Sequence, residues 1–399
     1  MKLRAVLPAA VTAAIILAAG TVPALAQSLF ATRGLGLPIQ PLDARARALG
    51  GVGTGLLGIN TSLVNPADAI GLTRRAIGAS VQPTGGEAEL NGETGEFGAT
   101  RFPSVRLIIP LGTRFGLSVG YGSVLEQSWA LETTGETQIG DETIETRDLI
   151  EADGGVSRVE IGLAFAITQS LAIGAAGGVY AGQLERSIRR AFVDPDILLA
   201  PFEQKLRFGF SGPHATVGAR WNPIPVLRLG AAFTLGDNLE VDVEEGSAAG
   251  EDWRLPMRLN AGVSGLLTPE LALAVGAERA WGADDEPIAG ASVRADTWRL
   301  GGGLEYTGLR TSSHLFPIRL GYANEDLPYH LETETPATER AFTFGLGIRF
   351  GGVDGGTPNA VVDAALERGE RTGLESTRNP GGLTESFWRM TFSLTLLGF

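Results

Sequence analysis

The chain has 399 residues, 56 of them glycine and none of them cysteine, with a formal net charge of −13. Without cysteine there is no disulfide framework and no thiolate metal site, and the acidic balance argues against nucleic acid as a partner. The mean hydropathy is only +0.11, and past the N-terminus no apolar run is long enough for a membrane-spanning helix. A membrane barrel of strands is still compatible with this composition, because only alternate residues of its strands are apolar.

The first residues have the pattern of a secretory signal peptide. Lys2 and Arg4 form a basic start, residues 5–22 are mostly apolar, and Ala24-Leu25-Ala26 offers small side chains for cleavage. We expect residues 1–26 to be removed and the mature chain to start at Gln27. An uncleaved N-terminal anchor is the alternative, but no stop-transfer pattern or basic flank follows to favour it. The prediction is therefore export, with the outer membrane of a Gram-negative type cell as the destination.

From about Arg101 onward, large apolar residues alternate with small or charged ones. Clear series of alternating apolar positions are Phe115, Leu117, Val119 and Tyr121; Val159, Ile161, Leu163 and Phe165; and Phe342, Phe344, Leu346 and Ile348. Such alternation predicts strands with one apolar face, which a soluble β-sandwich would also show. The small and charged opposite face is not a sandwich core, and strands in lipid must close so that no edge is left unpaired. We expect an all-β fold, a transmembrane antiparallel β-barrel of about 14 strands.

The predicted turns are of two kinds. Short turns are expected at residues 111–113, 168–169, 222–225 and 268–269, and long external loops near residues 123–155, 236–254, 281–296 and 323–340. The long loops are acidic. They form either a solvated surface or, alternatively, a surface where divalent cations bridge carboxylates to anionic lipid head groups.

Residues 27–75 lack the alternation of the barrel. A helix-like stretch from Leu42 is followed by a glycine-rich stretch and then by Asn65-Pro66-Ala67, where Asn65 is placed to cap a short helix. Residues 27–75 are therefore predicted to be a hatch or plug inside the lumen, and residues 76–399 the transmembrane barrel.

Both ends of the chain resemble known outer-membrane barrels. Ala46-Arg47-Ala48 with Gly50, Gly51 and Gly53, followed by Asn65-Pro66-Ala67, resembles the opening of the FadL superfamily of long-chain fatty-acid transporters. The C-terminal part resembles the PorV-type branch at Asp363, Ala365, Glu367, Gly369 and Arg371, and then at Glu385, Phe387, Arg389 and Thr391. The first resemblance implies a plugged barrel in which hydrophobic molecules bind and leave sideways. The second implies a barrel that holds secreted proteins and conducts nothing.

Charged residues of the expected strands face the lumen if the apolar face is in lipid. The set is Arg114, Arg158, Glu160, Arg228, Arg258, Glu278, Arg299, Glu305, Arg319, Arg349, Asp363, Glu367 and Arg389. An arginine or lysine on the lipid face would cost roughly 2–4 kcal/mol near the midplane. The charges form either a lattice of ion pairs that holds the plug or a polar lining for a solute path. No apolar stripe is apparent on the inner face that would form an acyl-chain site.

Two motifs with catalytic or cofactor associations are weak. The stretch from Gly53 to Gly58 fits a dinucleotide-binding pattern, but it follows no strand and opens no βαβ unit, so a flexible plug backbone is the preferred interpretation. His214, His314 and His330 lack metal-ligand spacing, and a Ser211–His214 pair has nothing else to single it out. No cofactor or metal is expected, and an outer-membrane enzyme is the least favoured function.

The last strand ends on Phe399, with Trp388, Met390, Phe392, Leu394 and Leu396 expected to face lipid. A terminal phenylalanine resembles the signal that barrel-assembly machinery recognises. Because Phe399 is out of register with this face, it lies either beyond the bilayer or after a bulge. The expected partners are outer-membrane lipid, barrel-assembly machinery, and hydrophobic small molecules or secreted proteins. The most favoured function is passage of small hydrophobic or amphipathic molecules across the outer membrane.

Overall fold

The alternating strands close on themselves in the computed structural model. It describes residues 28–32, 36–90, 93–139, 142–192, 201–236, 238–246, 252–282, 296–328, 337–351, 357–373 and 382–399. The predicted signal peptide and His330 lie outside these residues. The described strands belong to one sheet, in which β20 (Leu383–Leu397) pairs antiparallel with β2 (Ala76–Leu90). This pairing closes the sheet into a barrel of 14 antiparallel strands, as predicted.

Several of these 14 strands are interrupted and so carry two labels. After β2 the wall comprises β3 (Glu93–Arg101), β4 (Ser104–Leu111), β5 (Phe115–Glu126), β6 (Trp129–Ile139), β7 (Glu142–Ala166), β8 (Leu171–Phe192), β9 (Phe202–Ile224), β10 (Leu227–Thr234), β11 (Asn238–Glu245), β12 (Trp253–Arg254), β13 (Met257–Leu266), β14 (Leu271–Trp281), β15 (Thr297–Tyr306), β16 (His314–Leu315), β17 (Ile318–Asp326), β18 (Thr338–Phe350), β19 (Ala360–Gly373) and β20. The N-terminal segment adds η1 (Leu29–Thr32), β1 (Leu37–Pro38), α2 (Ala44–Ala48) and η2 (Pro66–Ala69). No helix in the described ranges is both long and apolar enough to cross a membrane.

The two faces of the wall differ as the alternation predicts. Ile161 is 61% exposed and Phe342 is 73% exposed, whereas their polar neighbours Glu160 and Thr343 are buried in the lumen. Exposed apolar side chains on one face and buried polar ones on the other are the inverse of a soluble protein. The bilayer supplies the apolar environment that the outer face requires.

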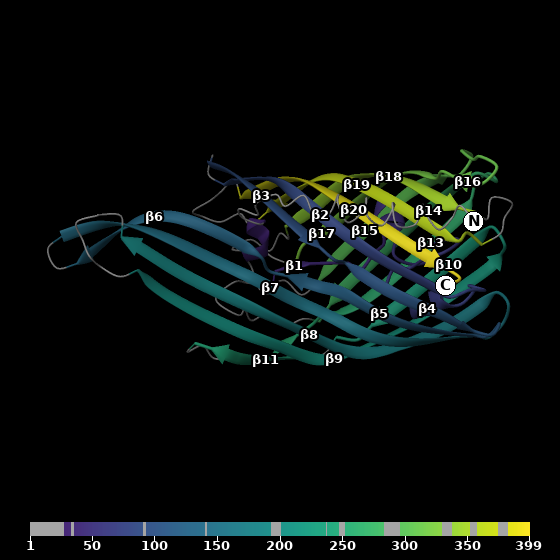
Figure 1. The fold of residues 1–399 in the computed structure, drawn as a ribbon, viewed down its shortest axis with the longest axis horizontal. Coiled ribbons are helices and arrows are strands. Elements are labelled where there is room, and N and C mark those ends of the chain that lie inside the picture. The colour runs from purple at the N-terminus through teal and green to yellow at the C-terminus, as the bar shows by residue number, and fades with distance from the viewer. Residues whose placement is uncertain are drawn as a thin grey trace.

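The short turns predicted at residues 111–113, 168–169 and 268–269 are confirmed, whereas the one predicted at 222–225 lies at 225–226, because β9 continues to Ile224. Two of the predicted long loops are largely strand. Residues 123–155 include all of β6 and the start of β7, and residues 236–254 include β11. The β7–β8 ladder continues without a break from Ala166↔Ala172 to Thr146↔Phe192. Figure 1 shows β6, β7 and β8 projecting beyond the rest of the barrel at the end opposite the short turns. Ladder hydrogen bonds need no apolar face, so pairing continues past the membrane where the side chains become polar.

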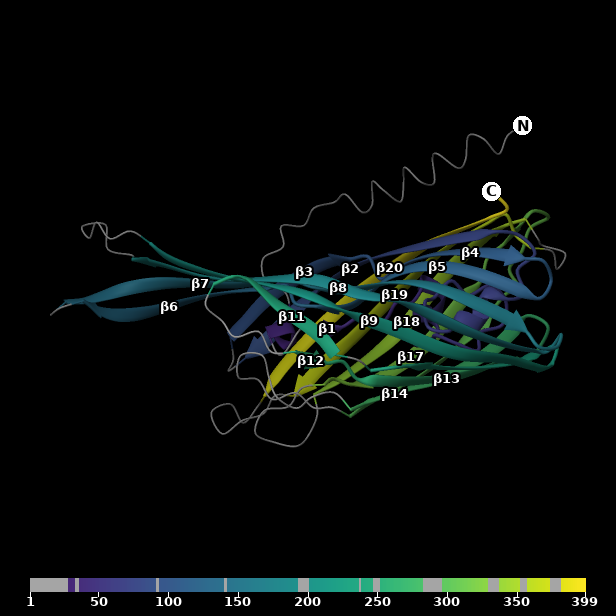
Figure 2. The same ribbon diagram turned by 90° about the horizontal axis from the view of Figure 1, so that it is seen from below.

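The closing strand has the predicted orientation. Trp388 and Met390 are exposed on the outer face, whereas Arg389 and Thr391 are buried. The strand ends at Leu397, Gly398 adopts a φ of 77°, and Phe399 follows it 62% exposed. The ladders with β2 and β19 shift nowhere near Leu397. Phe399 therefore lies past the end of the strand, at the short-turn end (Figure 2).

The orientation of β18 gives a stability prediction. Leu346 is 50% exposed in the middle of the outward series from Phe342 to Phe350. Leu346→Arg should lower the free energy of unfolding by roughly 2–4 kcal/mol, because a guanidinium replaces an apolar side chain near the bilayer midplane. Urea unfolding in lipid vesicles, followed by tryptophan fluorescence, measures this. Ser386→Arg, on the outer face near the external end of β20, is the control and should cost less than about 1 kcal/mol. Equal losses for the two variants would contradict the placement of the membrane.

Candidate functional site

A segment from Gly36 to Gly71, called the plug below, lies inside the barrel. Its short helix α2 is entirely buried, and Asp43 caps it by accepting from the amide of Ala46 at 2.8 Å. The second helical turn, η2, has Asn65 as its cap and Pro66 at its first position, as the sequence predicts. The Asn65 amide also donates to the carbonyl of Ala219 on β9 at 2.9 Å. The cap of η2 therefore also joins the plug to the wall.

Five inward arginines of the wall, called the wall arginines, donate to main-chain carbonyls of the plug. They are Arg106 to Ser62 (2.7 Å) and Asn65 (3.3 Å), Arg158 to Leu63, Arg220 to Ile70, Arg228 to Leu56 (2.7 Å) and Gly58 (2.9 Å), and Arg299 to Gly51 (2.7 Å). All these carbonyls lie outside α2 and η2, and only that of Asn65 accepts a backbone hydrogen bond from a described helix of the plug, through the Asp68 amide. The wall supplies the missing donors as charge-assisted hydrogen bonds, which are stronger than neutral ones.

The glycine-rich part of the plug lies directly against glycines of the wall. A Cβ on Gly301 would lie 1.9 Å from the carbonyl oxygen of Gly50, and one on Gly262 would lie 2.2 Å from that of Thr54. Gly50 and Gly55 also have positive φ angles of 69° and 72°. The stretch that fits a dinucleotide-binding pattern thus provides backbone contact with the wall. This close packing differs from the flexible plug backbone that we expected.

A lattice of ion pairs joins the plug to the strands near β18. Arg45 of the plug pairs with Glu305 at 2.8 Å, Glu305 also pairs with Arg319 at 2.7 Å, and Arg319 pairs with Asp363 at 2.7 Å. Arg349 approaches Glu305 at 3.5 Å. All but Arg349 are nearly or fully buried, so each charge needs its partner.

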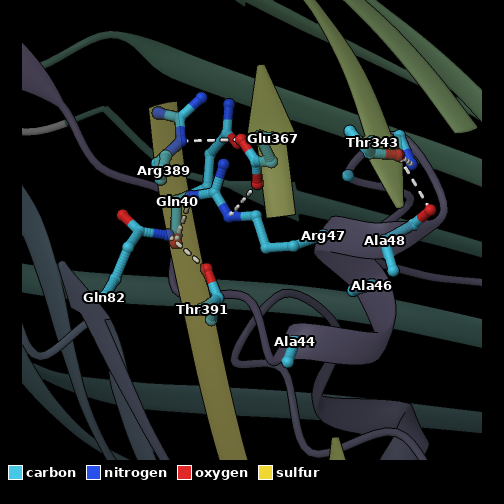
Figure 3. A network of polar contacts seen from close by, with 12 residues as sticks. Gln40, Ala44, Ala46, Arg47, Ala48, Gln82, Thr343, Glu367, Arg389 and Thr391 are labelled. Atoms are coloured by element: carbon cyan, nitrogen blue, oxygen red, sulfur yellow. Dashed lines mark hydrogen bonds and ion pairs between the residues drawn. The ribbon is translucent and has the colours of Figure 1, made fainter. Parts of the chain in front are cut away.

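A second group of charges lies around Arg47 (Figure 3). Glu367 is 3.8 Å from Arg47 and 2.6 Å from Arg389. Arg389 also pairs with Glu339, which binds Arg371 at 2.7 Å. Beside this group Gln82 donates to Thr391, and Thr343 donates to the carbonyl of Ala48, both at 2.8 Å. The plug motif residues contact three strands of this side of the wall: Arg47 approaches β19, the Gly50 amide donates to Thr343 on β18, and the Gly51 carbonyl accepts from Arg299 on β15.

The other predicted lumen charges lie on the inner face in local pairs. Arg158 is 3.1 Å from Glu160, Arg258 is 3.5 Å from Glu278, and Arg299 is 3.2 Å from Glu325. There are two exceptions: Arg228 forms no ion pair among the described residues, and Arg114 is exposed in the turn between β4 and β5. The sequence reasoning missed Arg106 and Glu339. Both occupy inward-facing positions of their strands. Arg106 lies between Val105 and Leu107, and Glu339 lies two residues before the inward-facing Ala341.

His214 is buried in the lumen, where its ring contacts Tyr180, Glu160 and Thr216 and, among the described residues, no serine. Its ring nitrogens lie 2.9 Å from the Tyr180 hydroxyl and 2.9 Å from the Glu160 carboxylate. Ser211 is on the exposed outer face of β9. The Ser211–His214 pairing considered from the sequence is therefore wrong.

The external half of the lumen contains an apolar cluster that the sequence analysis did not identify. This external apolar cluster comprises Val124, Leu125, Ala152, Val156, Tyr180, Leu184, Phe208, Phe210, Leu239, Val241, Trp253 and Leu255, with Trp129 packed against it. Tyr180 and Leu184 lie on the same side of β8 as the buried Ala172 and Ala176. The expectation that the inner face lacks an apolar surface is therefore wrong.

The wall is split beside this cluster. The β4–β5 ladder runs from Leu111↔Phe115 to Ser104↔Gly122. Beyond it β3 pairs with β2 and β6 pairs with β7, and no ladder joins β3 to β6 in the described part of the chain. Arg101 and Glu126 form an ion pair across the base of the split. Strand β1 pairs with the end of β5 there, from Leu37↔Glu126 to Pro38↔Leu125. Strand β1 thus lies at the gap. The edge of the gap includes Val124 and Leu125 of the apolar cluster and Trp129, which packs against it.

The described residues include no group of three or more His, Asp or Glu side chains that could hold a metal ion. The lumen thus combines three features: a plug held by arginines, ion-pair lattices on one side, and an apolar cluster next to a split in the wall on the other.

Comparisons with known proteins agree with this architecture. The family model described as BamG matches residues 5–264. Similar solved structures include a Pseudomonas aeruginosa FadL homologue (16% identity, TM-score 0.61, covering 91% of this chain and 99% of that one). Others are the Ralstonia pickettii toluene transporter TbuX (16%, 0.56, 90% and 99%) and the CymD monoaromatic hydrocarbon channel (16%, 0.54, 90% and 97%). No curated protein sequence matches the chain. At these identities the solved structures establish the fold.

The contacts of Arg106 give a prediction about the plug. Arg106 is 1% exposed and binds two plug carbonyls. Arg106→Gln should lower the free energy of unfolding by about 1.5–3 kcal/mol or more, since charge-assisted bonds to buried carbonyls are lost. It should also raise single-channel conductance in planar bilayers, because the plug is held less firmly.

Arg258→Gln is the matched control for this variant. Arg258 pairs with Glu278 on the neighbouring strand, and no hydrogen bond from it to the plug occurs among the described residues. Its conductance should stay at the wild-type level. If both variants raise conductance equally, the arginine contacts do not hold the plug.

Proposed function

The chain belongs to the BamG family, and we propose that this member passes small hydrophobic or amphipathic molecules across the outer membrane. The observation that carries the proposal is the contact between the external apolar cluster and the split in the wall. Val124, Leu125 and Trp129 belong to or pack on the cluster and also lie where β5 gives way to β6. A molecule bound at the cluster is therefore next to a side exit.

The proposed route avoids the plug. A solute enters at the external end between β7, β8 and β9, where the buried side chains of Leu184, Phe208 and Phe210 offer apolar contacts. Each square ångström of apolar area removed from water contributes about 25 cal/mol. The solute then leaves through the split between β3 and β6, where the outer face of the wall is in contact with lipid. Movement of β1 away from the end of β5 would widen this exit.

The fold likeness to a toluene transporter and a monoaromatic hydrocarbon channel supports this class of solute by analogy. The ion-pair lattices around Glu305 and Glu367 lie on the other side of the lumen, away from the split. The proposal involves no catalytic step, cofactor or resident metal. The described residues give no specific support to the alternative of a barrel that anchors secreted proteins.

The same proposal includes the protein's destination and assembly. The predicted signal peptide takes the chain out of the cytoplasm, and outer-membrane lipid surrounds the exposed apolar face. The exposed Phe399 beyond β20 is the proposed contact for barrel-assembly machinery.

A variant inside the cluster tests the route. Leu184 is 1% exposed at its centre. Leu184→Gln should slow the uptake of radiolabelled toluene at least tenfold in cells that have no other barrel of this fold, because an amide must be desolvated beside the solute. Leu184→Met keeps an apolar side chain of similar volume and should keep uptake within about twofold of wild type.

Heat-modifiable mobility of the membrane-extracted protein provides the folding control. Wild-type uptake by folded Leu184→Gln protein would show that the cluster is not on the route.

A further inference from the structure

A cavity of about 290 Å³ lies at the short-turn end of the lumen, below the plug. Four arginines line it, Arg45, Arg220, Arg228 and Arg349, together with Asp43, Asp68 and Asp363. The turn residues Gly351 and Pro358 form part of its rim. None of these residues belongs to the proposed solute route, which lies at the external end.

The positive charge in this cavity is only partly compensated. Arg45 pairs with Glu305, and Asp363 pairs with Arg319. The Asp43 carboxylate accepts hydrogen bonds from the Ala46 amide and the Thr61 hydroxyl. Arg220 and Arg228 form no ion pair in the described part of the chain, and their hydrogen bonds go to the neutral carbonyls of the plug and to Asn222. Arg220 is buried and Arg228 is half-buried, and Asp68 is the carboxylate that acts on both, without an ion pair to either. A buried guanidinium without a direct carboxylate contact is unusual.

Asp68 provides the second observation. It lines the same cavity and is 6% exposed. One carboxylate oxygen, Oδ2, accepts from the amide of Asn60 at 2.9 Å. The other, Oδ1, is fully buried and has no hydrogen-bond partner among the described residues. A buried acceptor without a donor is costly, so Arg220 and Arg228 lack a direct ion-pair partner and Asp68 lacks a donor.

We propose that this cavity binds hydrogen phosphate, which accepts from Arg220 and Arg228 and donates its O–H to Oδ1 of Asp68. A water molecule could satisfy Asp68 but would leave the arginine charges uncompensated. Sulfate has the charge and shape to satisfy the arginines, but it carries no proton at neutral pH. The dianion of a phosphate monoester also lacks the proton on its phosphate, since its second pKa is about 6. Hydrogen phosphate retains one O–H and supplies both missing groups.

A bound phosphate would also stabilise the position of the plug. Arg220 and Arg228 hold plug carbonyls at Ile70, Leu56 and Gly58, and Asp68 belongs to the plug. A bound ion would therefore connect the wall to the plug, and a ligand that binds only the folded state raises the unfolding temperature.

The experiment uses the full mature chain, folded in detergent micelles at pH 7.5 and at constant ionic strength. Titration calorimetry compares inorganic phosphate, sulfate and glycerol phosphate. We expect inorganic phosphate to bind at least tenfold more tightly than either competitor and to raise the unfolding temperature. Wild-type protein that binds phosphate no better than sulfate, or not at all, overturns the proposal without any variant.

Two variants assign the binding to this cavity. Asp68→Asn replaces the acceptor by a possible donor, so sulfate should then bind within threefold of phosphate. Arg228→Gln should weaken phosphate binding at least tenfold. Arg299→Gln is the matched control, because Arg299 also binds plug carbonyls but does not line the cavity. It should keep phosphate affinity within twofold. A loss in Arg299→Gln as large as in Arg228→Gln, or an unchanged preference in Asp68→Asn, would show that the ion binds elsewhere.

Discussion

The main-chain carbonyls of the plug must find hydrogen-bond donors inside a lumen where few waters could reach them, and the rest of the interior depends on this requirement. An irregular segment with two helical turns cannot satisfy its own backbone. The barrel provides guanidinium groups at the ends of long side chains, and these reach carbonyls that strand amides cannot. Arg106 and Arg228 each bind two carbonyls of the plug. The wall therefore fixes the path of the plug by its side chains, and the plug fills space that would otherwise be wet.

This arrangement divides the lumen into two halves. Where plug helix α2 approaches β17 to β20, the wall bears arginines and carboxylates that pair across strands and with Arg45 and Arg47. On β5 to β9 the external half is apolar, and it is there that the wall opens. Each buried charge of the lattices needs its partner, and the lattices add to the hold of the wall arginines, which contact the plug from β7 and β9 as well. The apolar side chains of the other half are the ones next to the split in the wall.

The sequence predicts the barrel well because the period-two pattern has a direct physical cause in lipid. The faces of β5, β7, β18 and β20 and the short turns between them follow from it. The Asn65 cap was predicted separately, from an asparagine before a proline at the first helical position. Strand length could not be predicted, because β7 and β8 stay paired in water, where their polar faces look like loop sequence. The external apolar cluster was missed for a related reason. On β8, Tyr180 and Leu184 are separated by Gly182, and the outer face nearby also has alanine and glycine, so no contrast between faces remains. The sequence analysis did not extend the series of inward-facing residues far enough along the strands to include Arg106 and Glu339, so it missed their contacts.

The strength of the plug's attachment favours a sideways route over a central one. Each charge-assisted hydrogen bond contributes about 1.5–3 kcal/mol, and five wall arginines hold the plug, so releasing it as a unit would cost on the order of 10 kcal/mol. At that cost, the fraction of molecules with the plug released is very small at equilibrium. Strand β1, by contrast, is joined to β5 by a ladder of two residue pairs, Leu37↔Glu126 and Pro38↔Leu125. The least costly opening in this barrel is therefore the one at its side, next to the surface that suits an apolar solute.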